Sequence, residues 1–280
     1  MSAFVQRIRT AAWLGWQIES NWADAIVFGV YTLIRPIGTA LILGGMFWAV
    51  GATARRPALF AALYVANAVH EYVTRAVVGM GWVIVEEREQ YETLKLVYAS
   101  PIGMRTYLWG RASIKFALAS FTVVIVLVLG WFLFRVRWEW SAVQWLPLAV
   151  SFALVLVATL FLGFLVAGFA LVLPRIAMSM NEGIAIALYM LCGVIFPIDL
   201  MPHGLRELSL ALPFTYGYEA IRRFLLGHGA SAVLGRMSDL ELLGMLAVTT
   251  LAMSAIAHYG YTALENRARR EGRLDQTTMF

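Results

Sequence analysis

Charged side chains interrupt two long apolar stretches near the start of the chain. His70, Glu71 and Arg75 lie within 58–84, and Arg35 lies in the apolar stretch before it. An intramembrane charge costs about 2.5–3.5 kcal/mol on insertion scales, so such residues usually face the protein interior or a wet cavity. Glu71 and Arg75 are four residues apart and can pair on one helical face. The group could line a substrate path, lock the resting state of a dimer, or form an ion pair that only holds two helices together.

A histidine beside a carboxylate could also carry protons. Histidine titrates near neutral pH, so His70 next to Glu71 is compatible with a proton-coupled carrier. The competing interpretation of His70 is a polar contact between helices. The same group is the candidate centre for a membrane-embedded lipid-modifying enzyme, although Thr74 is its only nucleophile.

A charged segment, EEREQYETLKLVYASP at 86–101, follows the second apolar stretch. Leu94, Val97 and Tyr98 share one helical stripe, and most of the charged residues lie off it. Pro101 ends the segment, because the residue before a proline avoids the helical region. The pattern predicts a short amphipathic helix that lies against the membrane and presents its charges outward to a cytoplasmic partner.

A second unusual segment, 197–227, contains Pro197, Pro202 and Pro213 yet stays semi-apolar and aromatic. It predicts two short helices, broken at Pro213, that turn back towards the membrane on the outer side. Non-helical backbone at that depth must be buried in protein, because lipid offers it no hydrogen bonds.

The elements that position these segments are membrane-spanning helices. Hydrophobic residues make up 61% of the chain and charged residues 14%, whereas soluble domains have about 25% charged residues. A span needs about 20 apolar residues. We therefore expect an all-α integral membrane protein with six transmembrane helices, preceded by an interfacial helix over 1–22. The expected spans are 26–50, 58–84, 107–133, 147–173, 182–199 and 239–263.

Loop charges predict the orientation. The arginine-rich tail 265–273 follows the last span directly, and arginine and lysine favour the cytoplasmic side. An even number of spans then places both termini in the cytoplasm. Asn181 and Glu182 are expected to open the fifth span, where a carboxylate suits the start of a helix.

Together these features resemble the type-2 permease family of ABC transporters, over essentially the whole chain. The charged segment is similar to the family pattern E-R-E-x-G-T-L with a later S/T-P, through Glu87, Arg88, Glu89, Thr93, Leu94, Ser100 and Pro101. The outer segment is similar to the family run P…P…P…E-A-x-R-x-x-L-x-G, through Pro197, Pro202, Pro213, Glu219, Ala220, Arg222, Leu225 and Gly227. Glu92 stands in place of the family glycine, and Tyr91 adds one residue to the spacing.

The resemblance implies a single permease domain over 1–280, part of an exporter in the bacterial inner membrane. A dimer of permease subunits, identical or related, would work with two ATPase subunits that hold ATP and Mg. The segment 86–101 would be the coupling helix in a groove of the ATPase, with Glu87, Arg88, Glu89, Tyr91, Thr93, Leu94 and Pro101 as its coupling residues. The outer helices, with Pro197, Pro202, Pro213, Glu219 and Arg222, would cap the path.

Other classes of site find little support in the sequence. A P-loop needs Gly-Lys followed by Ser or Thr, but Lys95 and Lys115 follow Leu94 and Ile114. No cofactor is therefore expected on this chain, which is not expected to be an enzyme. The four histidines and one cysteine have no metal-ligand spacing. The scattered basic residues argue against nucleic acid. A mainly apolar path favours a hydrophobic or amphipathic cargo such as a drug or lipid.

Overall fold

The computed structural model describes residues 3–21, 24–49 and 56–274, apart from the side chains of Ala3, Phe4, Ala25, Tyr31 and Arg35. All regular structure in these residues is helical. The elements are α1 (Ala3–Ser20), α2 (Ala25–Ala49), α4 (Pro57–Val85), the π-helical turn η1 (Glu86–Gln90), α5 (Leu94–Ala99), α6 (Met104–Leu133), α7 (Trp145–Val172), α8 (Pro174–Leu191), η2 (Ile198–Leu200), α9 (His203–Leu210), α10 (Pro213–Leu226), η3 (Leu234–Arg236) and α11 (Asp239–Arg270).

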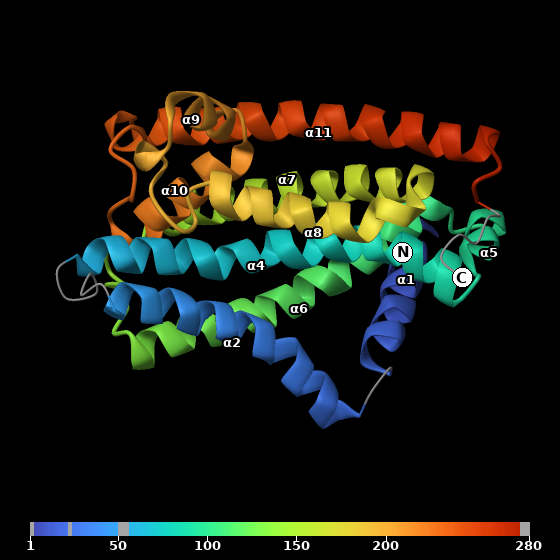
Figure 1. Cartoon of the computed structure of the whole chain (residues 1–280), viewed down its shortest axis with the longest axis horizontal. Coiled ribbons are helices and arrows are strands. Elements are labelled where there is room, and N and C mark those ends of the chain that lie inside the picture. Colours follow the sequence, from blue (N-terminus) through green and yellow to red (C-terminus); the bar gives the residue numbers. More distant parts are fainter. Residues whose placement is uncertain (1–2, 22–23, 50–55, 275–280) are drawn as a thin grey trace.

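The long helices form a bundle, and α1 crosses one end of it (Figure 1). Within the described residues, four helices are long and apolar enough to span a membrane: α2, α6, α7 and α11. Helices α4 and α8 run beside them (Figure 1). The chain is therefore a multi-pass helical membrane protein.

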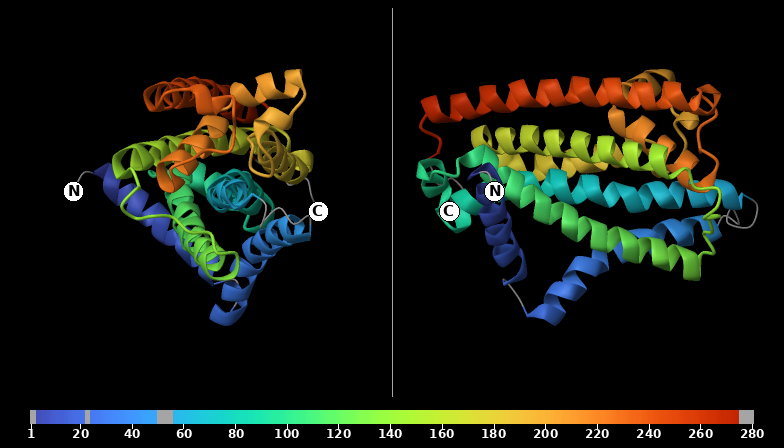
Figure 2. Two further views of the ribbon diagram at one scale, coloured as in Figure 1. Left: turned by 90° about the vertical axis from the view of Figure 1, so that its left-hand side faces the viewer. Right: turned by 180° about the vertical axis from the view of Figure 1, so that it is seen from behind.

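Helix α4 lies at the centre of the bundle, as the end-on view in Figure 2 shows. From Phe60 to Val73 every side chain is buried, on all faces of the helix. A helix that is apolar all round is an interior helix. Its neighbours are α6, α7, α8, α2 and α10, so any polar group on α4 is placed between helices.

The predicted fifth span at 182–199 is wrong by about two helical turns. Helix α8 instead covers Pro174–Leu191, because Pro174 fits a first helical turn, where its missing N–H is not needed. The chain leaves the helix at Cys192 and turns at Gly193, whose φ of 74° favours glycine. Asn181 and Glu182 accordingly lie within the helix and do not open it.

The two ends of the bundle are different. Helices α1 and α5 and the C-terminal end of α11 lie at one end, and α9 and α10 lie near the other (Figure 1). The segment 197–227 contains the two short helices α9 and α10, separated just before Pro213. Helix α10 is buried against α7, α11 and α4.

Candidate functional site

The segment 86–101 is not one helix, and this prediction is wrong. Helix α4 runs directly into the π turn η1. Residues 91–93 are not helical, and α5 after them has only six residues. The break centres on Glu92, whose φ of 52° lies in the left-handed region. Residues other than glycine rarely adopt that backbone conformation. This gives a physical reason for the glycine in the family pattern at this position.

Two of the charges expected to face outward are buried. Glu87 is 3% exposed and Arg88 2%. The Arg88 guanidinium donates to the carbonyls of Ala170 and Leu171, at 3.1 and 2.9 Å. These carbonyls belong to the last turn of α7, where carbonyl groups have no hydrogen-bond donor within their own helix. Arg88 therefore fastens the end of α4 to the end of α7.

Glu87 lies in a second network, between η1 and α6. It accepts hydrogen bonds from the hydroxyls of Tyr107 and Thr93. Arg111, whose side chain is fully buried, lies 3.7 Å from Glu87 and 2.5 Å from Glu86. Burial raises the pKa of the Glu86 carboxyl, and the positive charge of Arg111 opposes that shift.

The same network reaches α1. Glu19 pairs with Lys115 and lies 3.8 Å from Arg111. Helix α1 also comes very close to α6, because a Cβ on Gly110 would lie 2.4 Å from the Ala11 Cβ. Three glutamates and two basic residues thus join α1, η1 and α6 at one end of the bundle.

Helix α5 packs against the core of the bundle and against α11. Leu94 is buried, and Val97 and Tyr98 pack against the same core. The Arg269 guanidinium lies 4.7 Å from the centre of the Tyr98 ring and donates to Glu265 at 2.9 Å, so a cation–π contact joins α5 to α11. The predicted apolar stripe of this segment therefore faces the protein.

The outer face of the same segment is exposed. Leu96 is 67% exposed and Tyr91 41%, and Glu92, Lys95 and Pro101 are also exposed. A groove of about 610 Å³ lies between α5 and α1. Its apolar lining includes Leu14 and Ile18 of α1, Leu96 and Val97 of α5, and Ile102 just after α5. The end of the bundle thus presents an apolar groove beside a small, firmly anchored helix.

The charged residues of α4 connect it to its neighbours. His70 Nδ1 lies 2.7 Å from the Tyr218 hydroxyl of α10, and Arg75 donates to the Thr32 carbonyl of α2 at 2.6 Å. Glu71 is 8% exposed, so it faces protein in this chain. The Arg35 side chain lies outside the described part of the structure.

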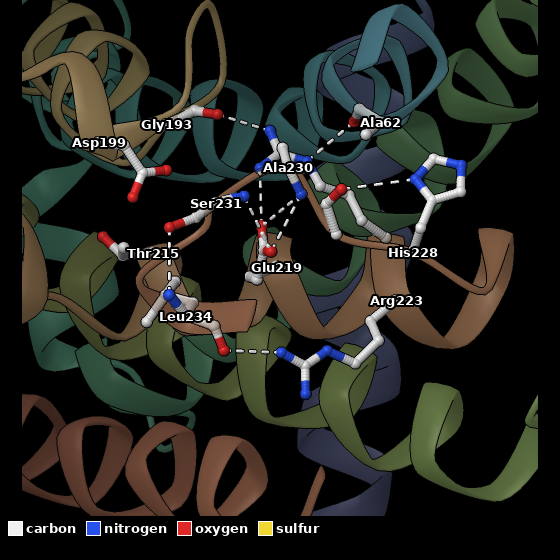
Figure 3. A network of polar contacts seen from close by, with 12 residues as sticks. Ala62, Gly193, Asp199, Thr215, Glu219, Arg223, His228, Ala230, Ser231 and Leu234 are labelled. Carbon is white, nitrogen blue, oxygen red and sulfur yellow. Dashed lines mark hydrogen bonds and ion pairs between the residues drawn. The ribbon is translucent and has the colours of Figure 1, made fainter. Parts of the chain in front are cut away.

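The outer motif of 197–227 forms a buried network (Figure 3). Arg222 donates to the Ala62 carbonyl at 2.8 Å and to the Gly193 carbonyl at 2.5 Å, and its second terminal nitrogen lies 3.4 Å from Glu219. Glu219 accepts from the backbone N–H groups of Ala230 and Ser231, at 3.0 and 3.1 Å. Arg222 therefore joins α10 to α4 and to the turn after α8, and Glu219 holds the loop that follows α10.

The three prolines of this segment begin structural elements. Pro213 is the first residue of α10, Pro202 directly precedes α9, and Pro197 directly precedes η2. Proline suits these places because it lacks a backbone donor and its φ is fixed. Their part in the motif is to set where each short helix starts.

These features define the class of protein: a multi-pass helical membrane protein with an anchored helix at one end and a proline-bounded helical pair at the other. A family model for the ABC-2 type transporter matches residues 8–226, well over half of the chain, so the chain belongs to the ABC-2 type transporter family. No curated relative matches it. Family membership makes it the permease of an ABC transporter, which works with an ATPase subunit.

Sequence reasoning missed the residues that anchor the segment 86–101. Glu19, Glu86, Tyr107 and Arg111 were not singled out, although Tyr107, Arg111 and Lys115 repeat every four residues at the start of α6. That spacing places polar groups on one face of an otherwise apolar helix. It is a signal for a buried polar seam, but it does not identify the partners.

Proposed function

We propose that this chain is the permease subunit of an ATP-driven exporter of hydrophobic or amphipathic compounds, such as drugs or lipids. A separate subunit hydrolyses ATP, and this chain is itself no enzyme. Six helices, α2, α4, α6, α7, α8 and α11, span the bacterial inner membrane with both termini in the cytoplasm. Two permease subunits, identical or related, pair with two ATPase subunits.

The observation that carries the proposal is the firmly anchored, outward-facing segment at one end of the bundle. Arg88 links it to α7, the Glu87 network links it to α6 and α1, and Tyr98 links it to α11. Interactions that fix a short element to several helices let a push on that element move them together. The exposed Leu96 and the apolar groove beside it provide the surface for a partner.

The exposed apolar side chains of α2 support an assembly larger than one chain. Ile34 is 64% exposed, Ile42 64% and Trp48 77%. In a membrane such a face contacts lipid or another subunit, because water is absent there. Pairing along a face of this kind would enclose a path lined mainly by apolar groups, which suits an apolar or amphipathic cargo.

The test is whether an ATPase subunit co-purifies with this chain. The tagged chain is expressed with its genomic neighbours, purified in mild detergent, and compared with Leu96→Glu and with Leu200→Glu. Leu200 is 74% exposed but lies in η2, away from α5, so it is the matched control. We expect the ATPase to co-purify with the wild type and the Leu200 variant and to be lost from the Leu96 variant.

A transport assay with the reconstituted protein distinguishes an ATP-driven permease from a proton-coupled carrier. Transport that needs ATP and the partner supports the proposal. A well-folded chain that binds no ATPase and transports in response to a proton gradient would overturn it, and would favour the carrier built on His70 and Glu71. Reversing Glu87 or Arg88 is a poor test of docking, because both are buried and the change would disturb the fold.

A further inference from the structure

A second cavity, of about 700 Å³, lies at the turn between α7 and α8. It is lined by Val172, Leu173, Pro174, Arg175, Ile176, Glu271 and Arg273. The lining combines exposed arginine with exposed apolar side chains: Leu173 is 38% exposed and Ile176 54%. The coupling networks described above do not use Arg175, and it makes no ion pair with the described residues.

The contacts of neighbouring elements place this cavity at the membrane surface. Helix α7 is long and apolar enough to span the membrane, and it ends at Val172. Helix α1 has the character of an interfacial helix: Trp13 is 62% exposed and Trp16 44%, and basic residues lie on the same helix. Arg111 contacts Glu19 of α1 and the η1 turn, and Arg88 of that turn bonds the end of α7. The α7–α8 turn thus lies near the level of α1.

The charge of the cavity is positive. Its one carboxylate, Glu271, is hydrogen-bonded by Arg267 at 2.7 Å and Arg273 at 2.5 Å. The bond from Arg267 is the main reason why the pKa of Glu271 is lowered, so this carboxyl stays ionised and paired. Arg273 also donates to the Val172 carbonyl at 2.5 Å, which holds it over the turn. The lining contains two arginines, Arg175 and Arg273, and one glutamate, Glu271, so its net charge is positive.

We propose that this cavity binds the headgroup of an anionic phospholipid of the adjacent leaflet. Arg175 and Arg273 face the phosphate, and Leu173 and Ile176 contact the first methylenes of the acyl chains. A surface that places exposed arginine directly beside exposed leucine and isoleucine matches a molecule with an anionic head and an apolar tail. A small soluble anion would leave the two apolar side chains uncovered, so the structure favours a lipid.

Native mass spectrometry of the full chain tests this proposal. The purified, delipidated protein is titrated with phosphatidylglycerol and, separately, with phosphatidylcholine. The variants are Arg175→Gln, Arg175→Lys and Arg236→Gln, the last of which removes an exposed arginine from η3, away from this turn. We expect a preference for phosphatidylglycerol that falls about fivefold in Arg175→Gln, the effect of one basic residue near an anionic surface. It should persist in Arg175→Lys and Arg236→Gln.

Three results would overturn the proposal. The wild type could bind both lipids equally well, or Arg175→Gln could keep the full preference, or Arg236→Gln could lose as much as Arg175→Gln. Competition with inorganic phosphate distinguishes the two sources of the anion. Displacement of phosphatidylglycerol by millimolar phosphate would identify a free-phosphate site and would also reject the lipid.

Discussion

Arg88 has a different role in the structure from the one that the sequence suggests. In the sequence it belongs to a charged run that suggests a docking surface. In the fold it is 2% exposed and bonds two carbonyls at the end of α7. A buried charge is tolerated only where it is well paired or hydrogen-bonded, and the negative end of a helix dipole is a favourable place for a cation. Arg88 is therefore a link between helices.

We expect Arg88→Met to weaken that link. The change leaves two buried carbonyls without a donor, and an unsatisfied buried group costs about 1–3 kcal/mol. Arg88→Lys keeps the charge but not the forked geometry, so we expect about half of that loss. Thermal unfolding in detergent measures both variants, and ATP-driven transport measured alongside ATPase activity tests coupling. An Arg88→Met variant with the wild-type melting temperature and transport would show that the link is unimportant.

The residue-level prediction failed at this point for a definable reason. The stripe analysis assumed one α-helix from 86 to 101, with 3.6 residues per turn. The π turn and the left-handed Glu92 rotate the residues out of that register, so Glu87 and Arg88 turn inward. The part of the stripe that lies within α5, Leu94 to Tyr98, keeps helical spacing, but its apolar face packs against the protein core, whereas the prediction placed it against the membrane.

At the scale of elements, long apolar runs predicted the positions of most of the long helices. Helices α2, α4, α7 and α11 begin within about two residues of the predicted spans, since an apolar run is bounded by polar or helix-starting residues. Helix α8 was misplaced because its first half carries Arg175, Asn181 and Glu182. A polar half-helix resembles a loop in a hydropathy scan, although here Asn181 is 1% exposed and lies against Gly81.

The docking of α1 on α6 depends on small residues at the contact. We expect Gly110→Val to separate the two helices, because even a Cβ there would lie 2.7 Å from the Ala11 and Ala12 backbones. Real structures essentially never contain such contacts, so one helix must move. Gly45→Val on α2, where a Cβ meets nothing within 4 Å, is the matched control.

Cysteine cross-linking between α1 and α6 and thermal unfolding measure this effect. Overpacking of this kind costs about 1–3 kcal/mol, so the Gly110 variant should melt earlier and lose the cross-link. The control should match the wild type in both. Retention of the cross-link in Gly110→Val would mean that α1 docks in another way.

At the scale of the whole molecule, the structure groups the polar networks by end. The anchored segment 86–101, α1 and the arginine-rich end of α11 share one end, and the Glu219–Arg222 network lies near the other (Figures 1 and 3). A sequence could predict this grouping, because consecutive spans alternate direction. The tertiary contacts could not be predicted, since Arg88 finds its acceptors more than 80 positions along the chain.

The proposed topology makes a direct prediction, because the chain has a single cysteine. Cys192 is 1% exposed, so the wild type should not react with a membrane-impermeant maleimide. Ala99 of α5 and Ala232 of the loop after α10 are both exposed, and Ala99→Cys and Ala232→Cys are matched changes.

We expect Ala232→Cys to react in intact spheroplasts and Ala99→Cys to react only in inverted vesicles. In the proposed topology an even number of spans precedes α5, whereas an odd number precedes Ala232. Labelling of both from the same side would contradict the six-span arrangement, and labelling with the sides exchanged would reverse the orientation that the arginine-rich tail predicts.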